Sequence, residues 1–147
     1  HDAHPLNTML CHISLNVISP EGAEINTQAM QFIRHSTDIY KSFIRPFIAE
    51  CKTYHHTPDL TDSDFSILEI SAPDKSKGAI TVITLCNCKE NSIVVKPKGI
   101  DVSKNYKVTL DNYEETFEIS GRQLKSHGIP VEISASLSSE LILYEAI

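Results

Sequence analysis

The chain has 147 residues, 41% of them apolar and 22% charged, which is typical of one ordinary folded domain or of a small domain with an appendage. Its 13 Lys and Arg against 19 Asp and Glu give a net charge of −6, and no basic cluster follows a strand or helix. A nucleic-acid-binding surface is therefore not expected. Nor is membrane association, because no apolar run approaches the roughly 20 residues of a spanning helix.

A long amphipathic helix is the first expected element, over residues 26–54. Its less polar residues recur at steps of three or four, and Asn26 or Thr27 can cap its start. Pro46 removes one backbone donor and clashes with the preceding turn, so a kink or break is expected near residues 42–45. The recurring positions are Met30, Ile33, Thr37, Tyr40, Ile44, Phe47 and Cys51, with Phe43 and Ile48 widening the stripe.

From about Thr57 the period changes to two. Tyr106, Val108 and Leu110 alternate with polar neighbours, as in an antiparallel sheet that is wet on one face. Short strands separated by turn residues at this spacing predict a β-sandwich. The seven expected strands are Phe65–Ile70, Ile80–Cys86, Ile93–Val95, Tyr106–Leu110, Glu115–Ile119, Val131–Ile133 and Leu141–Glu145.

Two unlike parts are therefore expected, residues 1–56 and residues 57–147. The boundary is placed where Pro58 disfavours helix at the preceding residue. Before the helix, the chain is expected to be irregular apart from one short strand candidate at His12–Ile18. Within the second part, Ser120 is expected to cap a single helical turn that ends at Gly128.

The order of these signals resembles the C-terminal β-domain of α-galactosidase-like glycoside hydrolases. A glycine-containing turn precedes a strand with the pattern Tyr-x-Val. A strand containing Phe is then followed by Ser-Gly-x-x-Leu and by Gly-Ile. Two small residues stand at the start of the last strand. The helix before them resembles the last barrel helix of such enzymes, and a short segment near the start resembles the eighth barrel strand. The residues are Cys11–Ser14, Tyr40–Ile48, Gly99–Asp101, Tyr106–Val108, Phe117, Ser120–Gly121, Leu124, Gly128–Ile129 and Ser138–Leu143.

The resemblance implies a mainly β fold, an antiparallel Greek-key-like β-sandwich preceded by a helical segment left over from a (β/α)8 barrel. It also implies that residues 57–147 are the non-catalytic C-terminal domain of a retaining α-glycosidase, supporting the catalytic barrel of the parent enzyme. Retaining enzymes need two carboxyl groups about 5 Å apart, and no matching pair is recognisable in this chain. No catalytic residue, metal site or cofactor is therefore expected here.

Other groupings of reactive residues have plainer explanations. His1, Asp2 and His4 could bind a metal and His12 a sugar, but a full ligand set is missing and a frayed terminus with a satisfied histidine is expected instead. Cys51, His55 and His56 could also be metal ligands, but a polar linker is expected there instead. Asp59, Asp62 and Asp64 could hold calcium, but they lack the glycine and the distal glutamate of a calcium-binding loop. Ser138, Ser139 and His127 lack the nucleophile elbow of a hydrolase. Cys11, Cys51, Cys86 and Cys88 do not have zinc spacing and are expected to be ordinary thiols.

Two other classes of function remain open from the sequence. A free-standing carbohydrate-binding module would share the sandwich architecture, but it would need exposed aromatic side chains, and the chain has no Trp. A protein-interaction domain would use the helix for docking. The apolar stripe of that helix is too large to leave wet, so it is expected either to fold back on the sandwich or to pair two copies as a homodimer.

Overall fold

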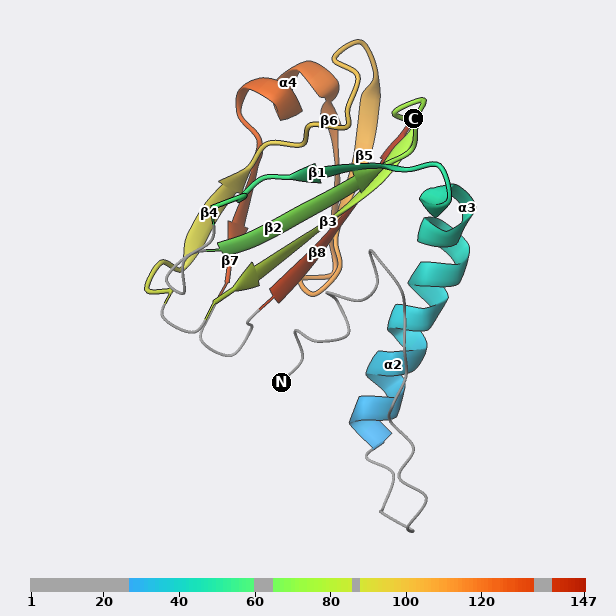
Figure 1. The fold of residues 1–147 in the computed structure, drawn as a ribbon, viewed down its shortest axis with the longest axis vertical. Coiled ribbons are helices and arrows are strands. Elements are labelled where there is room, and N and C mark those ends of the chain that lie inside the picture. The colour runs from blue at the N-terminus through green and yellow to red at the C-terminus, as the bar shows by residue number, and fades with distance from the viewer. Residues whose placement is uncertain (1–26, 60–64, 86–87, 134–138) are drawn as a thin grey trace.

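The computed structural model describes residues 27–59, 65–85, 88–133 and 139–147 (Figure 1). The strand candidate at His12–Ile18 and the segment Cys11–Ser14 lie outside these residues. The described chain forms a helical rod followed by two antiparallel sheets. The mainly β sandwich preceded by a helical segment, expected from the sequence, is confirmed.

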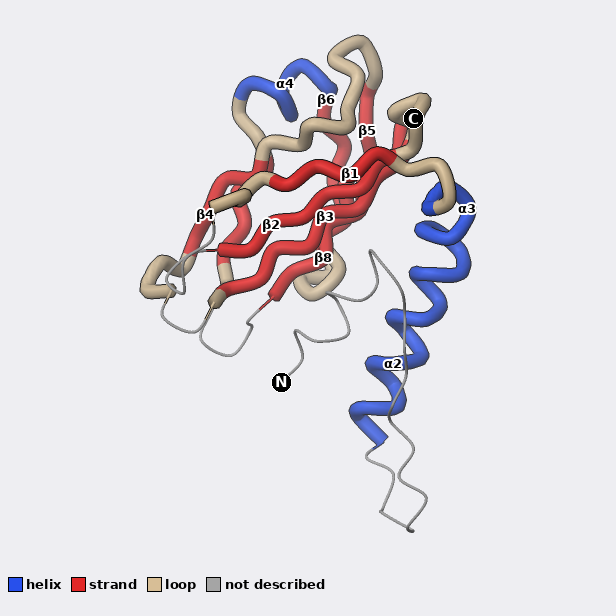
Figure 2. The backbone as a smooth tube through the Cα atoms, viewed as in Figure 1, coloured by secondary structure: helices blue, strands red, loops and turns tan. Residues whose placement is uncertain are grey.

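The larger sheet has six strands in the order β1-β2-β3-β8-β5-β6, all antiparallel (Figure 2). The last strand in the chain thus lies in the middle of the sheet. The bounds are β1 (Lys52–His55), β2 (Phe65–Ser71), β3 (Lys77–Thr84), β5 (Asn105–Leu110), β6 (Glu115–Ser120) and β8 (Ser139–Ala146). The smaller sheet pairs β4 (Ser92–Val95) with β7 (Ile129–Glu132).

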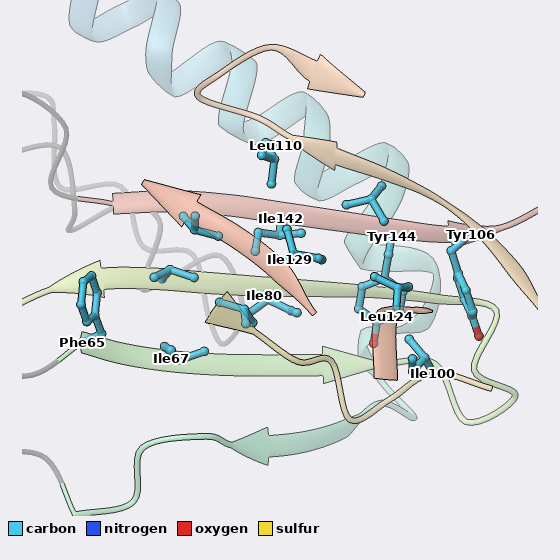
Figure 3. Packing of buried hydrophobic residues seen from close by; sticks show 14 of the residues in the cluster. Phe65, Ile67, Ile80, Ile100, Tyr106, Leu110, Leu124, Ile129, Ile142 and Tyr144 are labelled. Atoms are coloured by element: carbon cyan, nitrogen blue, oxygen red, sulfur yellow. The ribbon is translucent and has the colours of Figure 1, made fainter. Parts of the chain in front are cut away.

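The main core lies between the two sheets. Successive side chains of a strand point to opposite faces, so β3 directs Ile80 and Val82 to this core, and β8 directs Ile142 and Tyr144 to it. Val95 and Ile129 close it from the smaller sheet, and Figure 3 shows Ile129 among the side chains of the larger sheet. The alternation assigns one set of side chains in each strand to this core, and in β2, β3 and β8 the other set is partly buried on the opposite face.

The helical rod consists of three segments, α2 (Thr27–Ile39), η1 (Tyr40–Ile44) and α3 (Arg45–Ile48). The middle segment is a π-helix, in which Arg45 N–H bonds to the Tyr40 carbonyl. Pro46 explains this position, because it cannot donate to the carbonyl four residues earlier and it favours the first turn of a new helix. The expected disturbance near residues 42–45 is confirmed, and it takes the form of a π-helical segment.

The rod packs on the outer face of the larger sheet, opposite the main core. Ile44 and Phe47 are buried there against Ile70, Ala79 and Leu141, which point away from the sandwich interior. Burying each such side chain contributes roughly 1.5 to 3 kcal/mol. The N-terminal end of α2 projects beyond the strands (Figure 1). The helix has therefore folded back on the sandwich through its C-terminal half.

The short helix α4 (Gly121–Ser126) begins as the sequence predicts. Ser120 accepts a hydrogen bond from Gln123 N–H, and the Gln123 side chain bonds back to the backbone N–H of Ser120, forming a capping box. Gly128 follows with φ of 76°, a conformation that suits glycine. Leu124 is fully buried and closes one end of the main core.

Two local expectations were wrong. The helical pattern continues to Cys51, but the rod ends at Ile48. Residues 52–55 then form β1, whose pairing with β2 places Tyr54 opposite Glu69. A four-residue strand carries too few alternations to be distinguished from the end of an amphipathic helix. In the part of the chain that is described, no helix has the length and apolar character needed to cross a membrane.

Candidate functional site

The most densely hydrogen-bonded side chain of the sandwich is a buried carboxylate, Glu69 on β2. Its side chain is fully buried. Oε1 accepts bonds from Gly99 N–H at 2.7 Å and from the Tyr144 hydroxyl at 2.8 Å, and Oε2 accepts from Lys98 N–H at 2.9 Å. These donors come from the turn after β4 and from β8. Glu69 therefore joins three separate parts of the sandwich.

His56 completes this carboxylate cluster from the segment that leads from the rod into the sandwich. Its Nε2 lies 2.6 Å from Glu69 Oε2, and the imidazole is mostly buried. The next residue, Thr57, accepts a bond from Ile67 N–H through Oγ1 at 3.1 Å. Lys98 Nζ donates to the His55 carbonyl at 3.3 Å. The entry segment is thus fixed to β2 and to the Lys98–Gly99 turn by polar contacts.

The hydrogen bonds decide the charge of Glu69. Burial by itself would raise the pKa of this carboxyl, but the bonds from His56, Lys98, Gly99 and Tyr144 outweigh burial and hold the pKa below its ordinary value. Burial and the adjacent Glu69 carboxylate raise the pKa of Tyr144. The cluster therefore consists of an ionised carboxylate and a neutral phenol that donates to it.

Gly99 stands at this site because no side chain fits. A Cβ at this position would overlap Ser71 and come within 2.7 Å of the Tyr144 hydroxyl. The close approach lets the Gly99 N–H reach the carboxylate. The glycine of the family-like turn, singled out in the sequence, therefore has a steric reason here.

A second buried carboxyl, Glu140, lies at the start of β8 on the same face of the sheet. Its Oε1 accepts from Asn112 N–H at 2.9 Å and from Leu141 N–H at 2.7 Å. Its Oε2 has no hydrogen-bond partner among the described residues. Burial raises the pKa of Glu140 and the nearby Asp111 adds to this, against the backbone hydrogen bonds that lower it. The pKa values of the two buried glutamates are therefore shifted in opposite directions, because the two side chains differ in the number of donors.

A shallow hollow of about 520 Å³ lies between α3 and the β2–β3 turn. Two of its three charged side chains, Asp74 and Lys77, are already engaged. Asp74 Oδ1 accepts two bonds from Ser76, and Lys77 pairs with Glu145 at 3.1 Å and lies over the Phe43 ring. The remaining wall is largely apolar, with few polar groups left to orient a ligand. The lining residues are Pro46, Phe47, Ala49, Glu50, Ala72, Pro73, Asp74, Ser76 and Lys77.

The two buried glutamates do not have the arrangement that hydrolysis of a glycoside requires. A retaining enzyme needs two carboxyl groups facing one sugar across an open site. Glu69 and Glu140 are both fully buried, and Asp111 beside Glu140 is occupied by His35. These two carboxyls bond to backbone and side-chain donors inside the sandwich.

Most of the residues that the sequence singled out do not come together. His55 and Asp59 are exposed, and Cys51 is a half-buried free thiol. The described residues contain no group of three or more His, Cys, Asp or Glu that could hold a metal ion. His127 Nδ1 contacts the Ser126 hydroxyl at 2.8 Å, and Ser139 is buried in β8.

Other candidates lie outside the described residues. These are His1, Asp2, Cys11, His4, His12, Asp62, Asp64, Cys86 and Ser138.

Sequence reasoning missed the two buried glutamates and the role of His56, which was read as part of a polar linker. One signal was present, because Glu69 falls on the same strand face as Phe65 and Ile67 in an alternating segment. A charged residue at a core-facing position needs partners to be stable there. The donors of Glu69 lie 13, 29, 30 and 75 residues away, which strand alternation does not reveal.

No family model matches the sequence, and no curated protein matches it significantly. Comparison with solved structures does find matches. The chain is similar to the galactosidase domain of the α-galactosidase-sucrose kinase AgaSK, with a TM-score of 0.66 and 16% identity over 85% of this chain. It is also similar to the α-galactosidase from Lactobacillus brevis, with a TM-score of 0.67 and 18% identity over 84%.

A third match is the GH36 α-galactosidase AgaB from Geobacillus stearothermophilus, with a TM-score of 0.65 and 14% identity over 86% of this chain. In each case the chain spans 17% of the matched protein. The resemblance expected from the sequence is thus confirmed at the level of fold: a helical segment and antiparallel sandwich such as form one part of α-galactosidases.

Proposed function

We propose that this chain is the C-terminal portion of a retaining, α-galactosidase-like glycoside hydrolase, and that it supports the catalytic barrel of that enzyme without taking part in the chemistry. On this proposal residues 1–56 are the end of the barrel and residues 57–147 the C-terminal domain. The substrate of the parent enzyme would be an α-glycoside. The acid and the nucleophile would lie in parts of the enzyme outside this chain.

One observation carries the proposal, namely the extent of the structural match. A match to 85% of 147 residues is longer than residues 57–147 alone, so it extends from the sandwich into the preceding helical segment. Sandwich modules that occur on their own would account for the sandwich and not for the rod. The combination in this order supports a piece of a larger enzyme.

The rod supports the same interpretation. Its C-terminal half is buried on the sheet through Ile44 and Phe47, whereas Met30 at the other end is 44% exposed. Ile33 nearby is only half-buried. A helix that serves two neighbours would show this division, with one part packed on the sandwich and another left for the barrel.

The two alternatives, a carbohydrate-binding module and a homodimer through the helix, have fewer suitable surface residues in the described chain. A carbohydrate-binding module commonly stacks sugars on exposed aromatic rings, and in the described sandwich only Tyr113 is an exposed large aromatic residue. Its hydroxyl donates to the Glu132 carbonyl. A homodimer through the helix stays a prediction. It would use Met30 and Ile33, since Ile44 and Phe47 are already covered.

The proposal can be tested with the reading frame and with the purified chain. The frame upstream should encode several hundred residues of alternating strands and helices. The chain alone should not hydrolyse an aryl α-galactoside, and calorimetry with galactose and raffinose should show no binding. Turnover abolished by a single Asp or Glu substitution within residues 1–147 would overturn the non-catalytic role, and saturable sugar binding would favour the module.

The dimer has its own test. If two copies pair through the rod, sedimentation should detect a dimer that Met30→Asp converts to a monomer. The control is Val94→Asp, which introduces the same charge at another exposed apolar position, 54% exposed on β4. A monomer at all concentrations for the unmodified chain would end the dimer hypothesis.

A further inference from the structure

Four hydrogen-bond donors from three separate segments converge on the carboxylate of Glu69. They are the backbone N–H groups of Lys98 and Gly99, the Tyr144 hydroxyl and His56 Nε2, all within 3.1 Å of a carboxylate oxygen. An ionised carboxylate only accepts hydrogen bonds, so Nε2 of the histidine carries the proton of its contact. These donors are called the carboxylate cradle below. Every donor comes from elsewhere in the chain, and β2 supplies only the acceptor.

Two consecutive backbone N–H groups form the floor of the carboxylate cradle. The Lys98 nitrogen lies 2.9 Å from Oε2 and 3.1 Å from Oε1, and the Gly99 nitrogen lies 2.7 Å from Oε1. Successive N–H groups of a turn that point to one place make a concavity that binds anions. The turn is fixed by its neighbours, since Pro97 and Ile100 are buried on either side of it. The arrangement is thus that of a site for an anion with two acceptor oxygens.

The hydroxyl wall of the cradle does not depend on Glu69 for its position. Tyr144 stands opposite Gly78 on the neighbouring strand, where a Cβ would come within 2.1 Å of the phenol ring. Its ring meets Tyr106 edge to face, with centroids 5.8 Å apart. The Tyr106 hydroxyl is in turn bonded to two backbone groups, each at 2.8 Å. Packing therefore holds Tyr144, and removal of Glu69 should leave its hydroxyl aimed at the same place.

The fourth donor, His56, connects the entry segment (residues 52–57) to the cradle. The strand in this segment, β1, has side chains that are exposed or half-buried, so apolar burial contributes little to holding it. The His56 N–H bonds to the Ile67 carbonyl at 3.1 Å, and the imidazole is 11% exposed. The Glu69 carboxylate joins this imidazole to the Lys98–Gly99 turn. An empty cradle would therefore release the imidazole and weaken the attachment of the entry segment.

We propose that the cradle is a binding site for a carboxylate anion, that Glu69 is its internal ligand, and that occupation of the site holds the entry segment on the sandwich. The donors suit a carboxylate because each of its oxygens finds at least two of them. Glu69→Ala would remove one methylene carbon and the carboxyl group. Acetate, a methyl carbon that bears a carboxylate, has the same heavy atoms and can fill the vacated space. This property belongs to the chain itself and does not rest on the proposed function.

Chemical rescue of Glu69→Ala tests the site, with urea unfolding of the full chain at pH 7. Sodium acetate at about 0.2 M should raise the folding equilibrium constant of this variant about fivefold over the same concentration of sodium chloride, as a site with a Kd of about 50 mM would. Acetamide is the matched probe, because it has the same shape but is neutral and offers a single acceptor oxygen, and it should give no such increase. The unmodified chain, whose site is filled, measures the general effect of acetate as a salt.

Glu140→Ala is the matched control variant. It empties a second buried carboxyl position on the same sheet face, where one oxygen has no partner among the described residues, and acetate should not rescue it. Equal effects of acetate and chloride on Glu69→Ala would overturn the binding site, and so would an equal gain in Glu140→Ala. Should Glu69→Ala fail to fold in chloride, refolding from urea measures the yield of folded chain instead. A yield that acetate does not raise above that in acetamide gives the same negative answer.

Hydrogen exchange tests the role of the entry segment. In Glu69→Ala the amide of His56, which bonds to the Ile67 carbonyl, should exchange faster than in the unmodified chain. Acetate should restore its protection, and chloride should not. A recovered urea midpoint without recovered protection at His56 would overturn the claim that occupation of the cradle holds this segment.

Discussion

Glu69 and Glu140 are the same residue type on the same face of one sheet, and both are fully buried. Glu69 has donors on both oxygens, whereas one oxygen of Glu140 has no partner among the described residues. Burial opposes the charged form in both cases, and hydrogen bonds favour it. The pKa is accordingly lowered for Glu69 and raised for Glu140. At the residue scale, the contributions of Glu69 and Glu140 to the free energy of unfolding should therefore change with pH in opposite directions.

Replacing Glu69 with Gln should destabilise the chain strongly at pH 7. One of the two acceptor oxygens would become an NH2 group that faces donors now bonded to that oxygen, leaving buried donors without an acceptor, at a cost of about 3 to 5 kcal/mol. Because the folded-state pKa of Glu69 is lowered, its stabilisation is present above the unfolded value and is lost as the pH falls through the folded value. Urea unfolding should thus show a smaller acid-induced loss for Glu69→Gln than for the unmodified chain. The solvent-exposed Glu118→Gln is the matched control and should change neither quantity.

Glu140→Gln should have the reverse pH dependence. Because the folded-state pKa of Glu140 is raised, its favourable contribution is present below the unfolded value and is lost as the pH rises through the folded value. The urea midpoint of Glu140→Gln relative to the unmodified chain should therefore increase between pH 4 and pH 8. A difference between the two midpoints that does not vary over this range would contradict a raised pKa of Glu140 in the folded chain.

At the scale of elements, the junction of rod and sheet concentrates the apolar contacts that hold the helix in place. Phe47 is buried against the sheet and meets Phe43 edge to face, with ring centroids 6.2 Å apart. Lys77 lies over Phe43, 5.4 Å from its centroid. The π-helical segment sits at this junction, where Ile44 is fully buried. The π-helical segment caused by Pro46 thus lies where Ile44 and Phe47 fasten the rod to the sheet.

Phe47→Ala should detach the rod from the sheet. Truncating a buried Phe removes its transfer free energy and leaves a cavity, for a loss of about 3 to 5 kcal/mol where the site cannot collapse. Thermal unfolding followed by circular dichroism should show a lower Tm, with helical signal lost before strand signal. Met30→Ala on the exposed end of the same rod should leave the Tm within the range of ordinary surface changes. Equal effects of the two variants would mean that Phe47 does not anchor the rod.

The elements that could be predicted from the sequence are those that repeat one pattern long enough. Each of the seven expected strands overlaps an observed strand, because alternation such as that of Tyr106, Val108 and Leu110 is set by the strand itself. The helical turn after Ser120 was likewise predictable from local capping chemistry. β1 was not, since its four residues are strand only through pairing with β2. The Glu69 cluster depends on contacts between distant segments and lies beyond any local pattern.

On the scale of the whole molecule, the sandwich and the rod share a hydrophobic cluster and yet differ in how fully they are enclosed. The sandwich buries Val82, Val108 and Ile142 completely, whereas α2 buries only Ser36. Segments with few buried apolar contacts open at lower free energy than core strands. The rod should therefore be the less stable part of the chain.

Hydrogen exchange at a single pH should reveal this gradient. Amides of α2 should exchange early, and those of Val82, Val108 and Leu143 should exchange near the rate set by global unfolding. η1 and α3 should fall between these limits because Ile44 and Phe47 are covered by the sheet. Protection of α2 equal to that of the central strands would show that the chain unfolds as one unit.

The place of β8 has a consequence for the order in which the chain can fold as it is synthesised. β8 is the last strand in sequence, and it lies between β3 and β5. Until residues 139–146 have left the ribosome, β1-β2-β3 and β5-β6 are two separate ribbons with exposed edges. Of the strands described, only β8 can pair with both β3 and β5 and join the two ribbons into one sheet. Folding of the sandwich should therefore be a late event, completed after translation of the whole domain.

A chain ending at residue 138 should expose apolar surface and aggregate, and addition of a peptide of residues 139–147 should restore soluble, folded protein. Folding of the shortened chain without the peptide would show that the two ribbons can close without their central strand.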